Sequence, residues 1–318
     1  MEKIGLPGLL AAIALSAVML LLTLCLFSAP GAIGDTGICL PSPNEWHIPK
    51  FIGWVLNSAL IFISAAVVSS ANRLYNFIPS PDFVLQAMML ILLASCCITT
   101  VTISTSTILM ATNIVAIFLL FETYESYNAS RNFFVMASVL SVGSMFQYAF
   151  LMMIPVYIIG GLLMKSFRLR ELIAFILGLV APYWVLVGLG IVPMPSLRMP
   201  DALQVLSTAK ANNDLFMALL AGGIMSVMGV IFCIYNSLRL LNRNSRLRSM
   251  HTAINVMGIV SVLCLFLNFN NFVSYLGTIA LWLAIETALL FELYGIRAPR
   301  FWMLVISAAF IVTYICSL

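Results

Sequence analysis

This sequence contains few charged residues. Only 15 Lys and Arg and 11 Asp and Glu are spread over 318 residues, so 8% of the chain is charged. Hydrophobic residues make up 63% of it, and the mean hydropathy is +1.11. A soluble globular domain carries about 25% charged residues, so this composition excludes a water-soluble globule. We therefore expect an integral membrane protein.

Histidine and patterned cysteine are also scarce. The chain has two His and seven Cys, without a CxxC motif or the spacing of a zinc site. We therefore predict no metal site and no cofactor. Most of the cysteines lie in apolar runs, where a thiol usually behaves as a small buried hydrophobe. Cys39 and Cys316 fall on the same side of the membrane in the topology below, where a disulfide and two free thiols are the alternatives.

The chain is organised around the stretch between Arg131 and Lys165, which contains 33 residues without a formal charge. One helix of that length would measure about 50 Å, whereas the hydrocarbon layer is about 30 Å thick. The sequence Gly143-Ser144-Met145-Phe146-Gln147 is the best place for a turn. We predict two shortened helices, at about 132–143 and 147–164, with a break within about four residues of Gly143. Arg131 and Lys165 then lie on the same side.

The other apolar runs predict nine further helices, and the first is too long for a signal peptide, whose apolar core has about 7–15 residues. Together with the short pair, they make an all-α polytopic transmembrane bundle of about eleven helices. No internal repeat is evident, so residues 1–318 are interpreted as one membrane domain. The nine helices are expected at about 8–27, 51–70, 83–103, 107–122, 172–192, 214–237, 252–267, 273–293 and from 301 onward.

Positive charge orients this bundle. Twelve Lys and Arg fall on the side of the N-terminus and three on the other, and cytoplasmic loops collect such residues. The net charge of +4 is explained in this way, so no nucleic-acid partner is expected. The prediction is a multi-pass membrane protein with a cytoplasmic N-terminus and a C-terminus on the outer side. The twelve are Lys3, Arg73, Arg131, Lys165, Arg168, Arg170, Arg239, Arg243, Arg246, Arg248, Arg297 and Arg300; the three are Lys50, Arg198 and Lys210.

The candidate catalytic residues lie in the first outer loop, at about 30–50. Asp35, Glu45 and His47 supply the groups that general-base chemistry requires, and Trp46 could stack on a sugar. The alternative is an ordinary solvated loop in which Trp46 anchors the chain at the interface. In the second long polar segment, Arg198 and Lys210 could hold a phosphate, and this makes them candidate ligand-binding residues.

Glu286 is a further candidate for ligand binding, because it is the only ionisable residue between Leu281 and Leu290. Charged groups at membrane depth usually face a cavity or a partner. Glu286 could therefore bind a ligand or a proton. The alternative is a structural carboxyl that is protonated or bonded to an amide, with Asn255 or Asn113 as the expected partner.

The motif Ala71-Asn72-Arg73-Leu74, the short-helix pair and the run Lys165-Ser166-Phe167-Arg168-Leu169-Arg170-Glu171 followed by Gly178-Leu179-Val180-Ala181-Pro182-Tyr183 carry a resemblance. With these motifs the chain resembles a family of polytopic inner-membrane proteins of Bacteroidota that have no established activity. This resemblance implies a place in the bacterial inner membrane, with the C-terminus in the periplasm. More distantly, its layout is similar to membrane glycosyltransferases and polysaccharide polymerases. That likeness implies membrane lipids and a polyprenyl-phosphate-linked glycan as partners. The first outer loop departs from that pattern, since its acids Asp35 and Glu45 are single and ten residues apart.

Three functions follow as alternatives. The first is an enzyme or accessory factor of lipid-linked glycan or cell-envelope assembly, with Asp35 or Glu45 as the base. The second is a transporter or flippase, with Glu286 in a cavity and broken helices around it. The third is a non-catalytic membrane subunit. An outward pocket beside the first outer loop would favour the first, a mid-membrane cavity at Glu286 the second, and a wide exposed groove the third.

Overall fold

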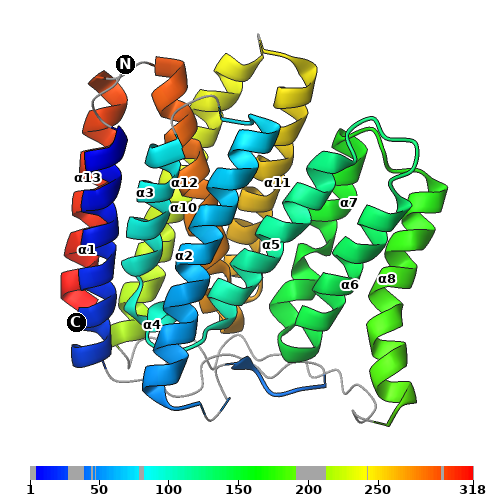
Figure 1. The fold of residues 1–318 in the computed structure, drawn as a ribbon, viewed down its shortest axis with the longest axis horizontal. Helices are drawn as coiled ribbons and strands as arrows, with labels where there is room; N and C mark the ends of the chain where they lie inside the picture. Colours follow the sequence, from blue (N-terminus) through cyan, green and yellow to red (C-terminus); the bar gives the residue numbers. More distant parts are fainter. Residues whose placement is uncertain are drawn as a thin grey trace.

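The computed structural model describes residues 5–27, 39–43, 46, 48–78, 82–190, 213–241, 243–294 and 297–317. Helices provide the regular structure of these residues and pack side by side (Figure 1). In chain order they are α1 (Gly5–Leu26), α2 (Lys50–Tyr75), α3 (Asp82–Ala94), α4 (Cys97–Thr100), α5 (Thr105–Glu122), α6 (Ser130–Phe146), the 3-10 helix η2 (Tyr148–Met153), α7 (Ile154–Leu163), α8 (Leu169–Gly188), α10 (Asn213–Leu240), α11 (Ser245–Leu267), the 3-10 helix η3 (Phe269–Asn271), α12 (Phe272–Tyr294) and α13 (Arg297–Ser317).

Seven of the described helices are long and apolar enough to cross a membrane, namely α1, α2, α5, α8, α10, α11 and α12. Three shorter apolar stretches, at 83–94, 148–163 and 303–317, accompany them. The all-helical class is thus confirmed, and the chain has the helices of a multi-pass membrane protein. Each apolar run that was predicted to be helical contains at least one helix, although one of these runs is divided.

The divided run is the one predicted as a single helix over 83–103. Helix α3 ends at Ala94, and after Ser95 and Cys96 only the short α4 follows. The hydroxyls of Thr99 and Thr100 both donate to the carbonyl oxygen of Cys96, at 3.0 and 3.1 Å. Such side chains compete with the helical backbone for its own hydrogen bonds. Hydropathy does not register this competition, and the prediction of one helix was wrong.

The predicted break after Gly143 is confirmed. Helix α6 ends at Phe146, and Gln147 is extended, with φ −156° and ψ 131°. The chain then turns through η2 into α7, and the ring of Phe150 packs where Gly143 has no Cβ. Both arms return to the same end, because Lys165 Nζ lies 3.1 Å from Glu125 Oε1 and Ser130 Oγ donates to Glu171 Oε1 at 3.3 Å.

Helix α12 is the centre of the bundle. Every residue from Asn271 to Leu290 is buried, and α12 packs against α10, α5, α11 and α3. Helix α8 is its opposite, lying at the edge of the bundle in Figure 1 and mostly exposed. In a membrane the apolar face of α8 contacts lipid, whereas α12 contacts only protein over this range.

Basic residues gather at one end of the bundle. Arg168 lies 4.6 Å over the ring of Tyr127, and Arg246 lies 5.9 Å over that of Tyr124, so the loops after α5 and α7 and the start of α11 meet there. Lys50 lies at the opposite end, where its Nζ donates to the carbonyl oxygens that end α1. The two chain termini are also at opposite ends (Figure 1).

Candidate functional site

Of the residues that the sequence marked as candidates, the structure describes one. Glu286 is placed in α12. The other candidates, Asp35, Glu45, His47, Arg198 and Lys210, lie outside the described residues.

The described part of the first outer loop is attached to the end of α6. The backbone N–H groups of Cys39 and Leu40 donate to the carbonyl oxygen of Met145, at 3.2 and 2.9 Å. The ring of Trp46 meets that of Phe146 edge to face, with 5.7 Å between the ring centroids. The Trp46 indole N–H donates to the carbonyl oxygen of Pro41 at 3.3 Å. The break in the short-helix pair is therefore the surface on which this loop rests.

Beside Trp46 lies an apolar cavity of about 400 Å³, here called the Trp46 groove. Its volume lies within the range of small-molecule sites, about 300–1,000 Å³. From Phe134 to Phe146 it follows α6 for about 18 Å. Phe134 and Val142 are 39% and 46% exposed, so the groove is open along the side of the bundle. It is lined by Pro43, Trp46, Ile108, Thr112, Phe134, Val135, Ser138, Val139, Val142, Gly143, Phe146 and Phe150.

A second lateral cavity, of about 380 Å³, lies between α2 and α5 toward the basic end. Ile63, Val67 and Leu74 of α2 and Phe118 of α5 are among its lining residues. Its polar limit is Tyr75, whose hydroxyl donates to Glu122 Oε1 at 3.2 Å. Helix α5 therefore lines an apolar cavity near each of its ends.

Glu286 is fully buried, and its partner is Asn236 of α10. The Asn236 amide nitrogen donates to Glu286 Oε2 at 2.7 Å and to the Glu286 carbonyl oxygen at 2.9 Å. The expected partners were wrong. Asn255 instead accepts from the Trp282 indole at 3.1 Å, and Asn113 accepts from the Tyr157 hydroxyl at 2.6 Å. The general expectation of an amide partner on another helix is confirmed.

This pair keeps two unused hydrogen-bond acceptors. Glu286 Oε1 and Asn236 Oδ1 are buried and have no hydrogen-bond partner among the described atoms. Buried polar atoms are nearly always paired, so these two oxygens are the atoms of the pair that are open to a proton or to a hydrogen-bond donor.

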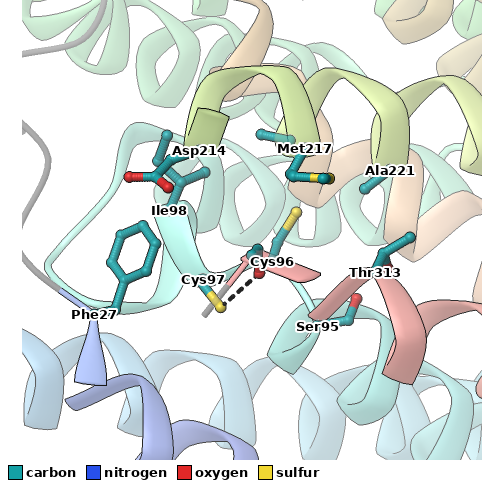
Figure 2. Close-up of a pocket in the computed structure, with 11 residues that line it drawn as sticks. Phe27, Ser95, Cys96, Cys97, Ile98, Asp214, Met217, Ala221 and Thr313 are labelled. Atoms are coloured by element: carbon teal, nitrogen blue, oxygen red, sulfur yellow. Dashed lines mark hydrogen bonds between the residues drawn. The ribbon is translucent and has the colours of Figure 1, made fainter. Parts of the chain in front are cut away.

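The cavity in Figure 2 is lined by reactive side chains but is too small to bind a substrate. Cys96, Cys97 and Asp214 line it together with residues of α13, and Cys97 Sγ lies 3.1 Å from Ser317 Oγ. Its volume of about 10 Å³ holds at most about one water molecule. No substrate fits there, and we interpret the cavity as a packing defect between α4, α10 and α13.

The cysteines form no disulfide. All seven are free thiols, and Cys96, Cys97, Cys233 and Cys264 are buried, as expected for apolar runs. Cys25 lies in such a run but is exposed, and Cys316 is exposed as well. Burial raises the pKa of the Cys39 thiol, which makes that thiol less reactive at neutral pH. Because Cys39 and Cys316 are both free thiols, the disulfide considered between them is not formed.

The Trp46 groove was not predicted from the sequence, although Trp46 itself was recognised as an aromatic contact in the loop. Its walls come from α5, α6 and the first outer loop, and hydropathy does not reveal which helices are neighbours. No protein-family model, curated protein or solved structure matches the chain, so the groove and the buried carboxyl are the basis for assigning a function.

Proposed function

We propose that the chain is a multi-pass protein of the bacterial inner membrane that takes part in the assembly of lipid-linked glycans or other envelope lipids. It binds a polyprenyl-phosphate-linked glycan with the hydrocarbon chain in the Trp46 groove and the polar head beside the first outer loop. The observation that carries this proposal is the groove itself. It lies beside the described part of that loop and is open at the side of the bundle.

The composition of the groove supports a hydrocarbon chain as its occupant. Phe134, Val135, Val139 and Val142 of α6 give it an apolar wall. Of the two hydroxyls in its lining, those of Thr112 and Ser138, the Ser138 hydroxyl donates to the Phe134 carbonyl oxygen at 2.8 Å. Trp46 closes one end of the groove, and Trp side chains are enriched at the interface between hydrocarbon and water. An amphipathic lipid in the groove would therefore have its head group at the Trp46 end.

The proposed catalytic and phosphate-binding residues lie in the two long polar loops. Glu45 and His47 are the direct neighbours of Trp46 in the chain, and with Asp35 they are the proposed general bases. Arg198 and Lys210 are proposed to hold the lipid phosphate through charge-assisted hydrogen bonds. In this proposal about eleven helices, with α6 and α7 as the shortened pair, cross the membrane. The N-terminus is cytoplasmic, and both loops are periplasmic.

Photocrosslinking tests the proposal. A polyprenyl phosphate with a photoreactive group on its chain is added to the purified protein, and the labelled peptides are identified by mass spectrometry. We expect labels in α5, in α6 and around Trp46. Competition by unlabelled polyprenyl phosphate, but not by a phospholipid, would identify the polyprenyl chain as the preferred occupant.

A matched pair of variants makes the test specific. Val142→Trp fills the groove, whereas Val180→Trp adds the same ring to α8. The two valines are similarly exposed, at 46% and 52%. We expect labelling to fall at least several-fold in Val142→Trp and to stay unchanged in Val180→Trp. Equal labelling of both variants, or labels confined to α8, would contradict the proposal.

A further inference from the structure

Five polar side chains follow one face of α12 and of the end of η3, which leads into it. Asn271, Tyr275, Thr278, Trp282 and Glu286 are spaced at intervals of three or four residues, which places them on the same side of a helix. All five are at most 1% exposed. They extend over about 22 Å of helix, so a polar line follows the central helix across much of the bundle.

The first four of these side chains are satisfied by neutral partners. The amides at positions 113, 147, 255 and 268 come from α5, the break after α6, α11 and the end of α11. Their contacts are Gln147 with Asn271, Asn268 with Tyr275, Asn113 with Thr278, and Asn255 with Trp282. Glu286 is the exception, because it is an acid with one oxygen unpaired.

The surroundings of Glu286 supply no described positive charge. The Asn236 amide is its hydrogen-bond partner, and the Cys233 thiol on the same helix is close enough to interact with it electrostatically. Helix α11 contributes Asn255, which bonds to Trp282 one turn before Glu286. The titratable side chain of α11 that is nearest to Asn255 in sequence is His251, and its Nε2 is hydrogen-bonded to the carbonyl oxygen of Phe77. A carboxylate that is buried without a cation is costly to keep ionised, and such a group takes up a proton instead.

The geometry of Asn236 indicates where that proton lies. Its amide nitrogen donates both hydrogens to Glu286, one to Oε2 and one to the carbonyl oxygen. These two bonds fix the orientation of the amide and leave Asn236 Oδ1 as an acceptor. Since Glu286 Oε2 already accepts a hydrogen bond, the unpaired Oε1 is the atom available for protonation.

We propose that the Glu286–Asn236 pair is a proton-binding site, in which Glu286 Oε1 accepts a proton from hydronium, leaving water, and later returns that proton to water. Binding forms the O–H bond and neutralises the carboxylate, and release restores the charge in the bundle centre. The site belongs to α10 and α12 and does not depend on the Trp46 groove between α5 and α6. It gives the chain a group through which a proton gradient could act on helix packing.

Infrared spectroscopy of the purified protein tests this proposal. At pH 7 the wild type should show the C=O absorption of a protonated carboxyl, which Glu286→Gln should lack. Glu125→Gln serves as the control and should leave the absorption unchanged, because Glu125 is exposed and paired with Lys165. Glu286→Asp keeps a carboxyl and should shift the absorption, so the assignment does not depend on recovering Glu286→Gln.

Exchange separates a binding site from a locked structural proton. The absorption should shift when the protein is transferred to D₂O, and it should disappear reversibly at alkaline pH. Identical spectra of the wild type and Glu286→Gln at pH 7 would show an ionised carboxylate and overturn the proposal. An absorption that neither shifts in D₂O nor titrates would show a permanently held proton and overturn it equally.

Discussion

The backbone N–H of Gly277 in α12 donates a hydrogen bond of 2.7 Å to Ser106 Oγ in α5. A Cβ at position 277 would lie only 2.7 Å from the carbonyl oxygen of Ser106 and 2.9 Å from its Oγ. The two helices therefore touch through backbone atoms, as small residues allow in membrane proteins. This contact holds the central helix against the helix that lines both lateral cavities.

Gly277→Ala should destabilise the protein. The added methyl group meets the backbone of α5, which cannot move aside as a side chain can, and overpacking of this kind costs about 1–3 kcal/mol. The better helix propensity of Ala returns at most about 1 kcal/mol. Gly223→Ala is the control, because a Cβ there has no neighbour within 4 Å. Thermal unfolding in detergent should show a lower midpoint for Gly277→Ala alone, and equal midpoints would refute the close contact.

Much of the fold was predictable because hydropathy and local polarity act on one segment at a time. The break at Gln147 follows from a segment too long for one crossing, with Gly143 and Gln147 at its softest point. The division of 83–103 was missed because Thr99 and Thr100 act through their hydroxyls on the Cys96 carbonyl. Those residues do not interrupt the apolar pattern.

The site was less predictable because it depends on which helices are neighbours. The burial of Glu286 followed from its isolation in an apolar run, but its partner did not. Asn236, Asn255 and Asn113 are all single amides in apolar helices, and the sequence does not distinguish among them. Only the order of the helices in space brings Asn236 to Glu286 and gives Asn255 to Trp282.

Asn113 should be the key member of a polar contact among three helices. It accepts from Tyr157 of α7 at 2.6 Å and donates to Thr278 of α12 at 3.0 Å, and all three side chains are fully buried. Asn113→Leu removes both bonds and leaves the Tyr157 hydroxyl without this acceptor, at a cost of about 1–3 kcal/mol. Thr278→Val removes one bond and keeps the shape of the side chain. Its cost should therefore be smaller, about 0.6 kcal/mol, as is typical of a hydrogen bond between membrane helices.

A double-mutant cycle of Asn113→Leu and Tyr157→Phe measures this contact directly. The two substitutions should be non-additive, because either one removes the same hydrogen bond. Strictly additive changes in the free energy of unfolding would mean that the two residues do not interact.

Lys165 combines two opposing effects at the end of the short-helix pair. Its φ is +57°, a left-handed conformation that costs a non-glycine residue about 1–2 kcal/mol. Its ion pair with Glu125 is exposed, with side chains 64% and 54% accessible, and such pairs contribute about 0–1 kcal/mol. Lys165→Gly should therefore leave stability unchanged or slightly higher. Lys165→Val loses the same charge but should destabilise, because a β-branched residue tolerates this conformation poorly.

Denaturation of these two variants beside the wild type separates charge from backbone conformation. If both lose the same stability, the ion pair is the dominant effect and the left-handed conformation is not.

The orientation of the bundle predicts which ends react from outside the cell. Pro41 in the first outer loop and Asn244 before α11 are both exposed, and they lie at opposite ends. Basic residues gather at the Asn244 end, which the positive-inside rule assigns to the cytoplasm. In a background without Cys25, Cys39 and Cys316, Pro41→Cys should react with a membrane-impermeant maleimide in intact spheroplasts. Asn244→Cys should react only after the membrane is permeabilised.

Position 166 is unsuitable for this experiment, although it lies in a basic loop. Ser166 is fully buried, and its hydroxyl donates to Thr123 Oγ1 at 3.0 Å. A cysteine there would stay unlabelled on either side of the membrane, so its silence would carry no information. Asn128 is exposed and lies at the same end, where Arg170 donates to its Oδ1 at 3.1 Å. Asn128→Cys should therefore react only after permeabilisation, as Asn244→Cys does. If both are labelled in intact spheroplasts and Pro41→Cys is protected, the topology is reversed and the first outer loop lies in the cytoplasm.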